Sequence, residues 1–263
     1  IAILYRSNAQ SRVLEEALLR ASIAYRIHGG VRFFERAEIK DALAYLRLLA
    51  NPHDDTAFER VVNFPTRGIG EKTLDDLRAL AKRCEMPLWT AAKELILSGG
   101  LPQRAATALN AFLTLIERLQ AQTKLMELDE QIREVITVSG LYAHFEKSKG
   151  DKSESKLENL QELISAAKQF RYEQTDDDEL PLLVAFLAHA SLEAGEMQAD
   201  EHERSVHMMT LHAAKGLEFP LVFMVGLEEG LFPGKQSFED PSRLEEERRL
   251  CYVGMTRAME KLV

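Results

Sequence analysis

The sequence predicts an α/β fold that is interrupted by an all-helical segment. Short apolar runs alternate with amphipathic helical periods in residues 1–52 and again in residues 205–263, as in a sheet covered by helices. Between these segments, residues 53–204 show successive helical periods, broken by glycine and proline, and no convincing strand. Because consecutive elements usually lie side by side in space, we predict one discontinuous α/β domain with a mostly α-helical domain inserted in it.

The first α/β segment alternates strands and helices. Its apolar residues 1–5 predict a buried strand, residues 9–21 an amphipathic helix, and residues 24–28 a second strand that ends at two glycines. A further helical period covers residues 36–50 and is closed by an Asn-Pro pair. We therefore expect the helical insertion to start directly after this helix.

The last α/β segment follows a polar linker that we expect at residues 194–204. Residues 206–211 and 221–226 predict two strands, and a charged helix is expected from residue 244 to about residue 260. Residues 261–263 read as the start of another strand. Because both ends of the chain fall in strands, we expect it to be a piece of a longer protein.

Composition and charge narrow the class of protein. The 263 residues are 46% hydrophobic and 29% charged, which is typical of a soluble globular protein and excludes global disorder. The formal net charge of −9 is opposite in sign to that of a protein that binds nucleic acid by bulk charge, so any such contact must be local. Two distant cysteines, Cys84 and Cys251, form no metal-binding or disulfide pattern, and the apolar residues 180–192 fall short of the roughly 20 needed to span a bilayer. We expect a cytoplasmic protein that holds no metal of its own.

A polar turn follows the predicted strand at residues 206–211. It offers the hydroxyl of Thr210, the imidazole of His212, the ammonium of Lys215 and the carboxylate of Glu218. Because open α/β sheets bind ligands where their strands end, we expect these four side chains to lie near one edge of the sheet. A solvated loop without a function explains this segment alone equally well.

The charged helix that begins near residue 244 carries three arginines, Arg248, Arg249 and Arg257. Guanidinium groups bind phosphates, and an arginine supplied by a neighbouring domain stabilises the negative charge that builds up during phosphoryl transfer. A surface helix crossed by Glu–Arg ion pairs also explains this segment when it is taken alone.

Together, the two segments closely resemble motifs five and six of the UvrD/PcrA/Rep family of DNA helicases. The matching stretches are TLHAAKGLEFPLVFMVGLEEGLFP from residue 210 and EEERRLCYVGMTRA from residue 245. The resemblance extends to residues 1–18, to residues 25–49 and to TRGIG at residues 66–70, so it covers nearly the whole chain. It implies a partial RecA-like domain of the P-loop NTPase type, interrupted by a helical accessory domain.

The resemblance also implies roles for individual residues. Arg257 matches the arginine finger that reaches the γ-phosphate of a nucleotide bound between two motor domains. Glu218 matches a residue near the ribose, with Lys215 and Gly216 in the adjacent turn. Four further residues match positions that face single-stranded DNA: Thr210, His212, Arg6 and Asn8.

The TRGIG segment precedes a predicted helix. Its glycines let backbone N–H groups approach a phosphate, which the positive end of the helix dipole favours. In the family this element resembles a helix-hairpin-helix that holds duplex DNA, so we expect Thr66, Gly68, Ile69 and Gly70 to contact the duplex. An ordinary glycine turn between helices remains the alternative.

Aromatic residues recur at apolar helical positions in the middle of the chain. We expect them to belong to the core rather than to stack on bases: Trp89, Phe112, Tyr142, Phe145 and Phe170.

The resemblance implies an ATP-dependent DNA helicase that travels 3′ to 5′ along single-stranded DNA in repair or replication. Such a motor needs a phosphate-binding glycine loop and acidic residues for Mg²⁺. Residues 230–236, the nearest candidate, fail the required spacing, so ATP and Mg²⁺ would be held mainly by a motor domain that precedes Ile1. The chain alone is therefore expected to be catalytically inactive.

Two other functions stay open. The helical segment could act as a duplex-binding, protein-interaction or autoinhibitory module without chemistry of its own. The chain could also be an inactive helicase-like scaffold, although intact motifs five and six argue against it. Expected partners are single-stranded DNA, duplex or junction DNA, the missing motor domain and DNA-repair proteins.

Overall fold

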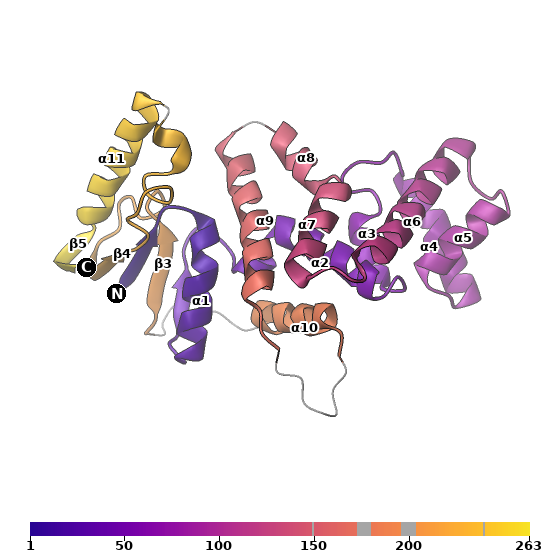
Figure 1. Ribbon diagram of the computed structural model, residues 1–263, viewed down its shortest axis with the longest axis horizontal. Helices are drawn as coiled ribbons and strands as arrows, with labels where there is room; N and C mark the ends of the chain where they lie inside the picture. Colours follow the sequence, from indigo (N-terminus) through magenta and orange to yellow (C-terminus); the bar gives the residue numbers. More distant parts are fainter. Residues whose placement is uncertain (149, 173–179, 196–203, 239) are drawn as a thin grey trace. The chain divides into compact units, whose positions relative to one another are not determined.

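The structure, a computed structural model, describes residues 1–148, 150–172, 180–195, 204–238 and 240–263 (Figure 1). Most of the predicted linker at residues 194–204 lies outside these ranges. The chain divides into two compact units, one formed by Ile1–Arg36 with Ala194–Val263 and the other by Ala37–Glu193. No helix in the described ranges has the length and apolar character that crossing a membrane requires.

The first unit contains a five-stranded sheet in the order β2-β3-β1-β4-β5. All neighbouring strands are parallel, so their carboxyl ends share one end of the sheet and their amino ends share the other. We call these the carboxyl end and the amino end of the sheet. The strands are β1 Ala2–Tyr5, β2 Tyr25–Ile27, β3 Val206–Thr210, β4 Phe219–Met224 and β5 Ala258–Leu262.

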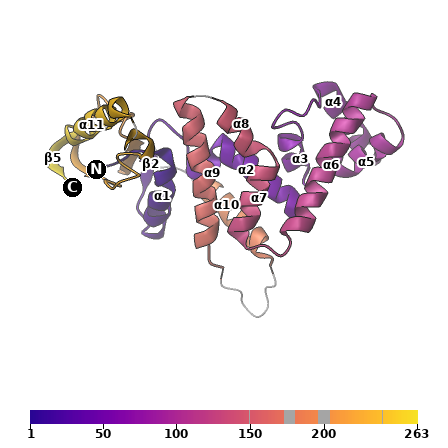
Figure 2. The same ribbon diagram turned by 45° about the horizontal axis from the view of Figure 1, so that its top comes forward.

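Helices cover both faces of this sheet (Figure 1 and Figure 2). On one face, Leu14, Leu18 and Leu19 of α1 (Ser11–Arg20) pack against a cluster that includes Tyr5 and Met208. On the other face, Leu250 of α11 (Pro241–Met255) joins a second buried cluster. Successive strand residues alternate between these clusters, as the pleat requires. The short 3₁₀ helices of this unit are η1 Asn8–Gln10, η2 Phe33–Glu35 and η3 Lys235–Phe238.

The last helix is shorter than the sequence predicts. It ends at Met255 rather than near residue 260, and residues 258–262 form β5. The reason is pairing: β5 lies beside β4, with Ala258 opposite Phe219 and Leu262 opposite Val222. Hydrogen bonds to a distant strand therefore override the local helical period.

All the regular secondary structure in the described residues of the second unit is helical. Its helices are α2 Ala37–Ala50, α3 Asp55–Val61, α4 Glu71–Cys84, α5 Leu88–Leu97, α6 Gln103–Thr123, α7 Leu128–Val138, α8 Leu141–Lys147, α9 Asp151–Gln169 and most of α10 Leu182–Gly195.

Helix α2 forms the centre of the second unit. Ile39, Ala42, Tyr45, Leu46 and Leu48 are completely buried, and α2 packs against α3, α6, α7 and α9. The compact unit therefore begins at residue 37, whereas the sequence places the domain boundary after residue 52. The difference arises because α2 follows the α/β segment in sequence but packs with the later helices.

Candidate functional site

Arg257 lies between α11 and β5, at the amino end of the sheet. Its Nη1 donates to the Leu217 carbonyl oxygen over 3.0 Å, Nη2 to the Thr256 hydroxyl over 3.0 Å, and Nε to the Val253 carbonyl over 3.1 Å. The guanidinium is thus held on three sides by neutral acceptors. None of these acceptors cancels the positive charge, which keeps the group suited to an anion.

The turn before β4 lies against Arg257. Gly216 adopts a φ of +89°, a conformation that favours glycine, and an added Cβ would meet no atom within 4 Å. Lys215 and Glu218 in the same turn are exposed, and the N–H of Phe219 donates to the Arg257 carbonyl over 2.9 Å. The four predicted nucleotide-facing residues, Arg257, Glu218, Gly216 and Lys215, therefore come from one pair of adjoining turns.

Arg6, Asn8 and Thr210 lie at the carboxyl end of the sheet. Tyr5 and Thr210 are opposite each other in β1 and β3, so Arg6 and the turn after Thr210 start at the same level. Thr210 accepts a hydrogen bond from the Ala213 N–H over 3.3 Å and shapes this turn. The exposed His212 follows Thr210 directly.

The expectation that Thr210, His212, Lys215 and Glu218 share one edge is wrong. Thr210 ends β3 at the carboxyl end, whereas Glu218 precedes β4 at the amino end. Because β3 and β4 are parallel within one sheet, the connection between them must return along the whole length of the strands. The structure therefore places the predicted nucleotide-facing residue Glu218 and the predicted DNA-facing residue Thr210 at opposite ends of the sheet.

Arg6 forms an ion pair with Glu247 of α11, which sequence analysis did not single out. The Arg6 Nε lies 2.8 and 3.1 Å from the two carboxylate oxygens, and Nη2 lies 2.7 Å from Oε1. The two residues are 241 positions apart, so no local pattern signals their contact.

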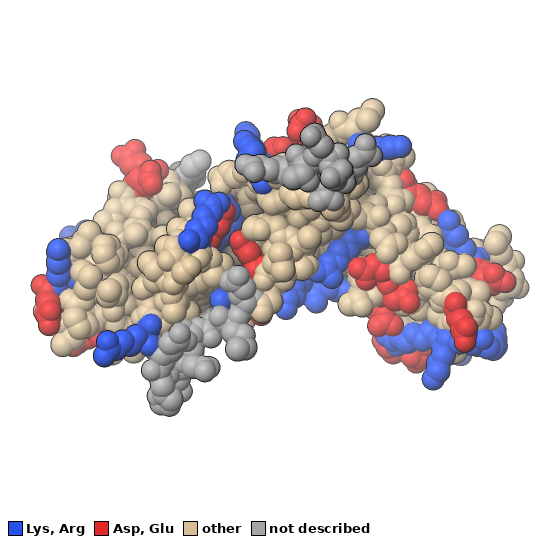
Figure 3. Space-filling model, turned by 90° about the horizontal axis from the view of Figure 1, so that it is seen from below, with Lys and Arg blue, Asp and Glu red and all other residues tan. Residues whose placement is uncertain are grey.

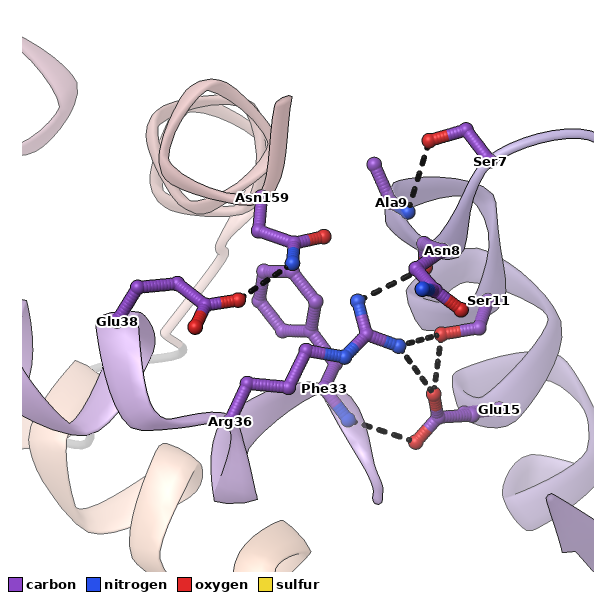
Figure 4. Close-up of polar contacts among 9 residues, drawn as sticks. All are labelled: Ser7, Asn8, Ala9, Ser11, Glu15, Phe33, Arg36, Glu38 and Asn159. Carbon is purple, nitrogen blue, oxygen red and sulfur yellow. Dashed lines mark hydrogen bonds and ion pairs between the residues drawn. The ribbon is translucent and has the colours of Figure 1, made fainter. Parts of the chain in front are cut away.

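Arg36 anchors the segment that contains Asn8 (Figure 4). Its side chain donates to the Asn8 carbonyl over 2.8 Å and to the Ser11 hydroxyl over 2.6 Å. Ser11 in turn donates to Glu15 over 2.6 Å, and the other Glu15 oxygen accepts from the Phe33 N–H. This buried network fixes the backbone at Asn8 and was not predicted.

The TRGIG turn lies before α4 in the helical unit. Gly68 has a φ of +81° and, like Gly70 and Thr66, is exposed, with open space where a Cβ would sit on either glycine. Gly70 is the N-cap residue of α4. The structure corrects the prediction for Ile69, whose side chain is 1% exposed and whose N–H donates to Asn63 Oδ1, so Ile69 belongs to the core and is not placed to contact DNA.

Arg67 holds this turn and was also missed. It donates to the carbonyl oxygens of Val61, Pro65 and Ser139 and to the Tyr45 hydroxyl. The available signal was an arginine inside a glycine turn, to which no role was assigned from the sequence. Because the half-buried guanidinium bonds to groups from several helices, the shape of the turn depends on the surrounding helices.

Figure 3 shows acidic and basic side chains interspersed over the displayed face. The net charge of −9 agrees with that pattern. Across the described residues, no three His, Cys, Asp or Glu side chains form a group that could hold a metal ion.

Comparison with known proteins gives consistent matches over the whole chain. Residues 1–263 match the family described as the UvrD-like helicase C-terminal domain. DNA helicase II of Escherichia coli (strain K12) is 59% identical over 261 residues, which are 99% of this chain and 36% of that protein. ATP-dependent DNA helicase PcrA of Bacillus subtilis (strain 168) is 43% identical over 268 residues, which are 100% of this chain and 36% of that protein. The chain thus spans about a third of the length of these relatives.

Proposed function

Because the chain belongs to the family of UvrD-like helicase C-terminal domains, we propose that it is part of an ATP-dependent DNA helicase. The proposed protein moves 3′ to 5′ along single-stranded DNA and unwinds duplex DNA during repair or replication in the cytoplasm. Its relatives are named DNA helicase II and ATP-dependent DNA helicase PcrA, which supports DNA as the substrate. The chain by itself is proposed to be inactive.

The observation that carries this proposal is the setting of Arg257. Its charge is oriented by three neutral oxygens and is not paired with any of them, at a half-buried position beside the Glu218 turn. When a γ-phosphate approaches this end of the sheet, the Arg257 guanidinium would lie beside it and stabilise the negative charge that accumulates on it during transfer. An arginine in this role accelerates hydrolysis by a factor of about 10³–10⁵.

Glu218 and the turn at Gly216 are the other groups that we propose this chain contributes to nucleotide binding. The exposed carboxylate of Glu218 can accept hydrogen bonds from ribose hydroxyls, while the open backbone at Gly216 leaves room for close approach. Mg²⁺, when bound, would neutralise charge on the phosphates. We propose that its ligands lie in the other motor domain, in the part of the intact protein that this chain does not cover.

The carboxyl end of the sheet is the proposed track for single-stranded DNA. Arg6, Thr210 and His212 offer charged and polar groups of the kind that bind a phosphate backbone, and the anchored segment at Asn8 adds a fixed main chain. Closure of the motor domains on ATP and reopening after hydrolysis would then convert each cycle into a step along the strand.

Hydrolysis by the intact protein tests the proposal. Arg257→Ala is expected to lower kcat by at least about 10³-fold while nucleotide binding persists, and Arg257→Lys is expected to restore little because an ammonium cannot reproduce the planar fork. Arg248→Ala is the matched control, since Arg248 lies on α11, the helix that precedes Arg257, and pairs only with Glu245 among the contacts described. Equal hydrolysis by Arg257→Ala and the control would reject the catalytic role of Arg257, whereas an intact wild-type protein without ATP hydrolysis would favour an inactive scaffold.

A second function rests on the TRGIG turn. The exposed, open positions of Gly68 and Gly70 at the amino end of α4 favour contact between this helical unit and duplex phosphates. An anisotropy titration of the chain with single-stranded, duplex and tailed junction DNA at several salt concentrations would reveal such a module. Preference for duplex or junction DNA is the expected result.

A further inference from the structure

Glu247 is a buried acid in the middle of α11. The Glu247 side chain is 8% exposed and its Arg6 partner is 32% exposed. Removing a carboxylate from water costs free energy, so a buried acid is retained where a cation holds it in place. Three atom pairs within 3.1 Å join Glu247 to Arg6 in a two-pronged arrangement.

The position of this pair links the two ends of the sheet. Glu247 contacts Arg6 beyond the carboxyl end of β1, and about two helical turns of α11 separate it from the end of that helix at Met255, two residues before Arg257. The same rigid helix therefore carries the anchor of Arg6 and leads directly to the residue that we assign to the nucleotide. Between these two points, Leu250 packs in the buried cluster on the sheet, and Gly254 lets the helix approach Leu211 and Met224 closely.

We infer that Glu247 is a positioning residue that orients Arg6 for a phosphate of single-stranded DNA and ties this contact to α11. The inference rests on the proposed function. A guanidinium that is held by a carboxylate through Nε and Nη2 keeps its plane fixed, so less rotational freedom is lost when a phosphate binds.

The inference predicts that neutralising Glu247 weakens DNA binding, which is opposite to the effect of removing a negative charge alone. Removing an acid near DNA reduces repulsion, so an acid without a positioning role should bind DNA equally well or more tightly when neutralised. Glu247→Gln should instead weaken binding, because the amide cannot offer two charged acceptors to Arg6.

The test measures the dissociation constant of the full-length protein for a labelled single-stranded oligonucleotide. We expect Arg6→Ala to weaken binding about tenfold and Glu247→Gln to weaken it about fivefold, with the double variant no weaker than Arg6→Ala. Glu246→Gln is the matched control, because it makes the same charge change one residue away on an exposed side chain. Glu247→Asp, which keeps the charge, should recover part of the lost affinity.

A second readout separates positioning from loss of structure. Glu247→Gln should raise the DNA concentration that half-saturates ATP hydrolysis, while kcat at saturating DNA stays at the wild-type value. A fall in kcat without a change in that concentration would overturn the inference.

The possible failures are distinguishable. If Arg6→Ala leaves DNA binding unchanged, the DNA contact in the proposed function is wrong. If Arg6→Ala weakens binding but Glu247→Gln behaves like Glu246→Gln, or if the two effects simply add, the positioning role of Glu247 is wrong and the proposed function stands.

Discussion

Arg257 and Leu217 are joined by a 3.0 Å hydrogen bond from the guanidinium Nη1 to the main-chain carbonyl oxygen. A second bond, from the Phe219 N–H to the Arg257 carbonyl, closes the connection from the other side. The end of α11 and the turn that carries Glu218 are therefore fixed to each other. A displacement of α11 must alter the position of both groups that we assign to the nucleotide.

Gly254 makes the close contact of α11 with the sheet possible. A Cβ at this position would lie 2.5 Å from Leu211 Cδ2 and 2.9 Å from Met224 Cε. We expect Gly254→Ala to lower the free energy of unfolding by about 1–2 kcal/mol, since overpacking outweighs the gain in helix propensity. Urea unfolding measures the change. Gly195→Ala on α10, where a Cβ meets nothing within 4 Å, should be neutral or slightly stabilising, and equal behaviour of the two variants would refute this packing argument.

Gly70 allows stability and duplex binding to be separated. Its extended backbone at the N-cap of α4 suits aspartate, so Gly70→Asp should leave the thermal midpoint unchanged or raise it. The new carboxylate should repel duplex phosphates and weaken duplex binding severalfold in an anisotropy titration.

Gln103→Glu provides the control for this variant. It adds the same charge to the first turn of α6, away from the TRGIG turn in sequence, and should leave duplex affinity unchanged. Equal duplex affinity of Gly70→Asp and Gln103→Glu would exclude the proposed duplex contact.

Arg36 should contribute more to stability than a surface arginine. Arg36→Lys loses the two-pronged reach to the Asn8 carbonyl and the Ser11 hydroxyl, and we expect the free energy of unfolding to fall by about 1–3 kcal/mol. Chemical denaturation measures the loss. Arg20→Lys, at an exposed pair with Glu16, should change little, and a comparable loss in this control would contradict the importance of the buried network.

The histidine pair His28 and His207 predicts a pH dependence of stability. Their ring nitrogens lie 2.6 Å apart, and burial lowers the pKa of each below its ordinary value of 6.5, with Arg26 adding to the shift for both. The unfolded chain therefore binds protons more readily than the folded one. The contribution of this pair to the free energy of unfolding is fully present above about pH 6.5. It decreases as the pH falls from there toward the lowered pKa values of the folded state.

Thermal midpoints measured from about pH 8 to about pH 5 check this dependence. In a variant with both His28→Gln and His207→Gln, the thermal midpoint should fall much less as the pH is lowered. An identical decline in the wild type and the variant would show that other groups cause it.

The sequence predicted those features that depend on local pattern. Apolar runs located β1 to β4, and Trp89, Phe112 and Phe145 are buried as expected from their helical spacing. Tyr142 is exposed, because the same helical period does not tell which turn of a short helix reaches the core. Family resemblance supplied the roles of Arg257 and Glu218, which remain predictions.

Features that depend on distant contacts could not be predicted. Helix α11 gave way to β5 because of pairing with β4, and the Arg6–Glu247 and Arg36–Asn8 contacts join separate elements. Ile69 was assigned to DNA because its neighbours are glycines, although an isoleucine in a polar turn is itself a signal of burial. Each of these errors concerns which residues meet in space.

The measurement that tests the central claim most directly is a titration of ATP hydrolysis by the intact protein with single-stranded DNA. The account predicts that Arg257→Ala lowers kcat at saturating DNA and leaves the half-saturating DNA concentration unchanged. It predicts that Arg6→Ala raises that concentration and largely preserves kcat, because the two residues act at opposite ends of the sheet. If both substitutions changed the same parameter alone, the separation of nucleotide and DNA sites would be contradicted.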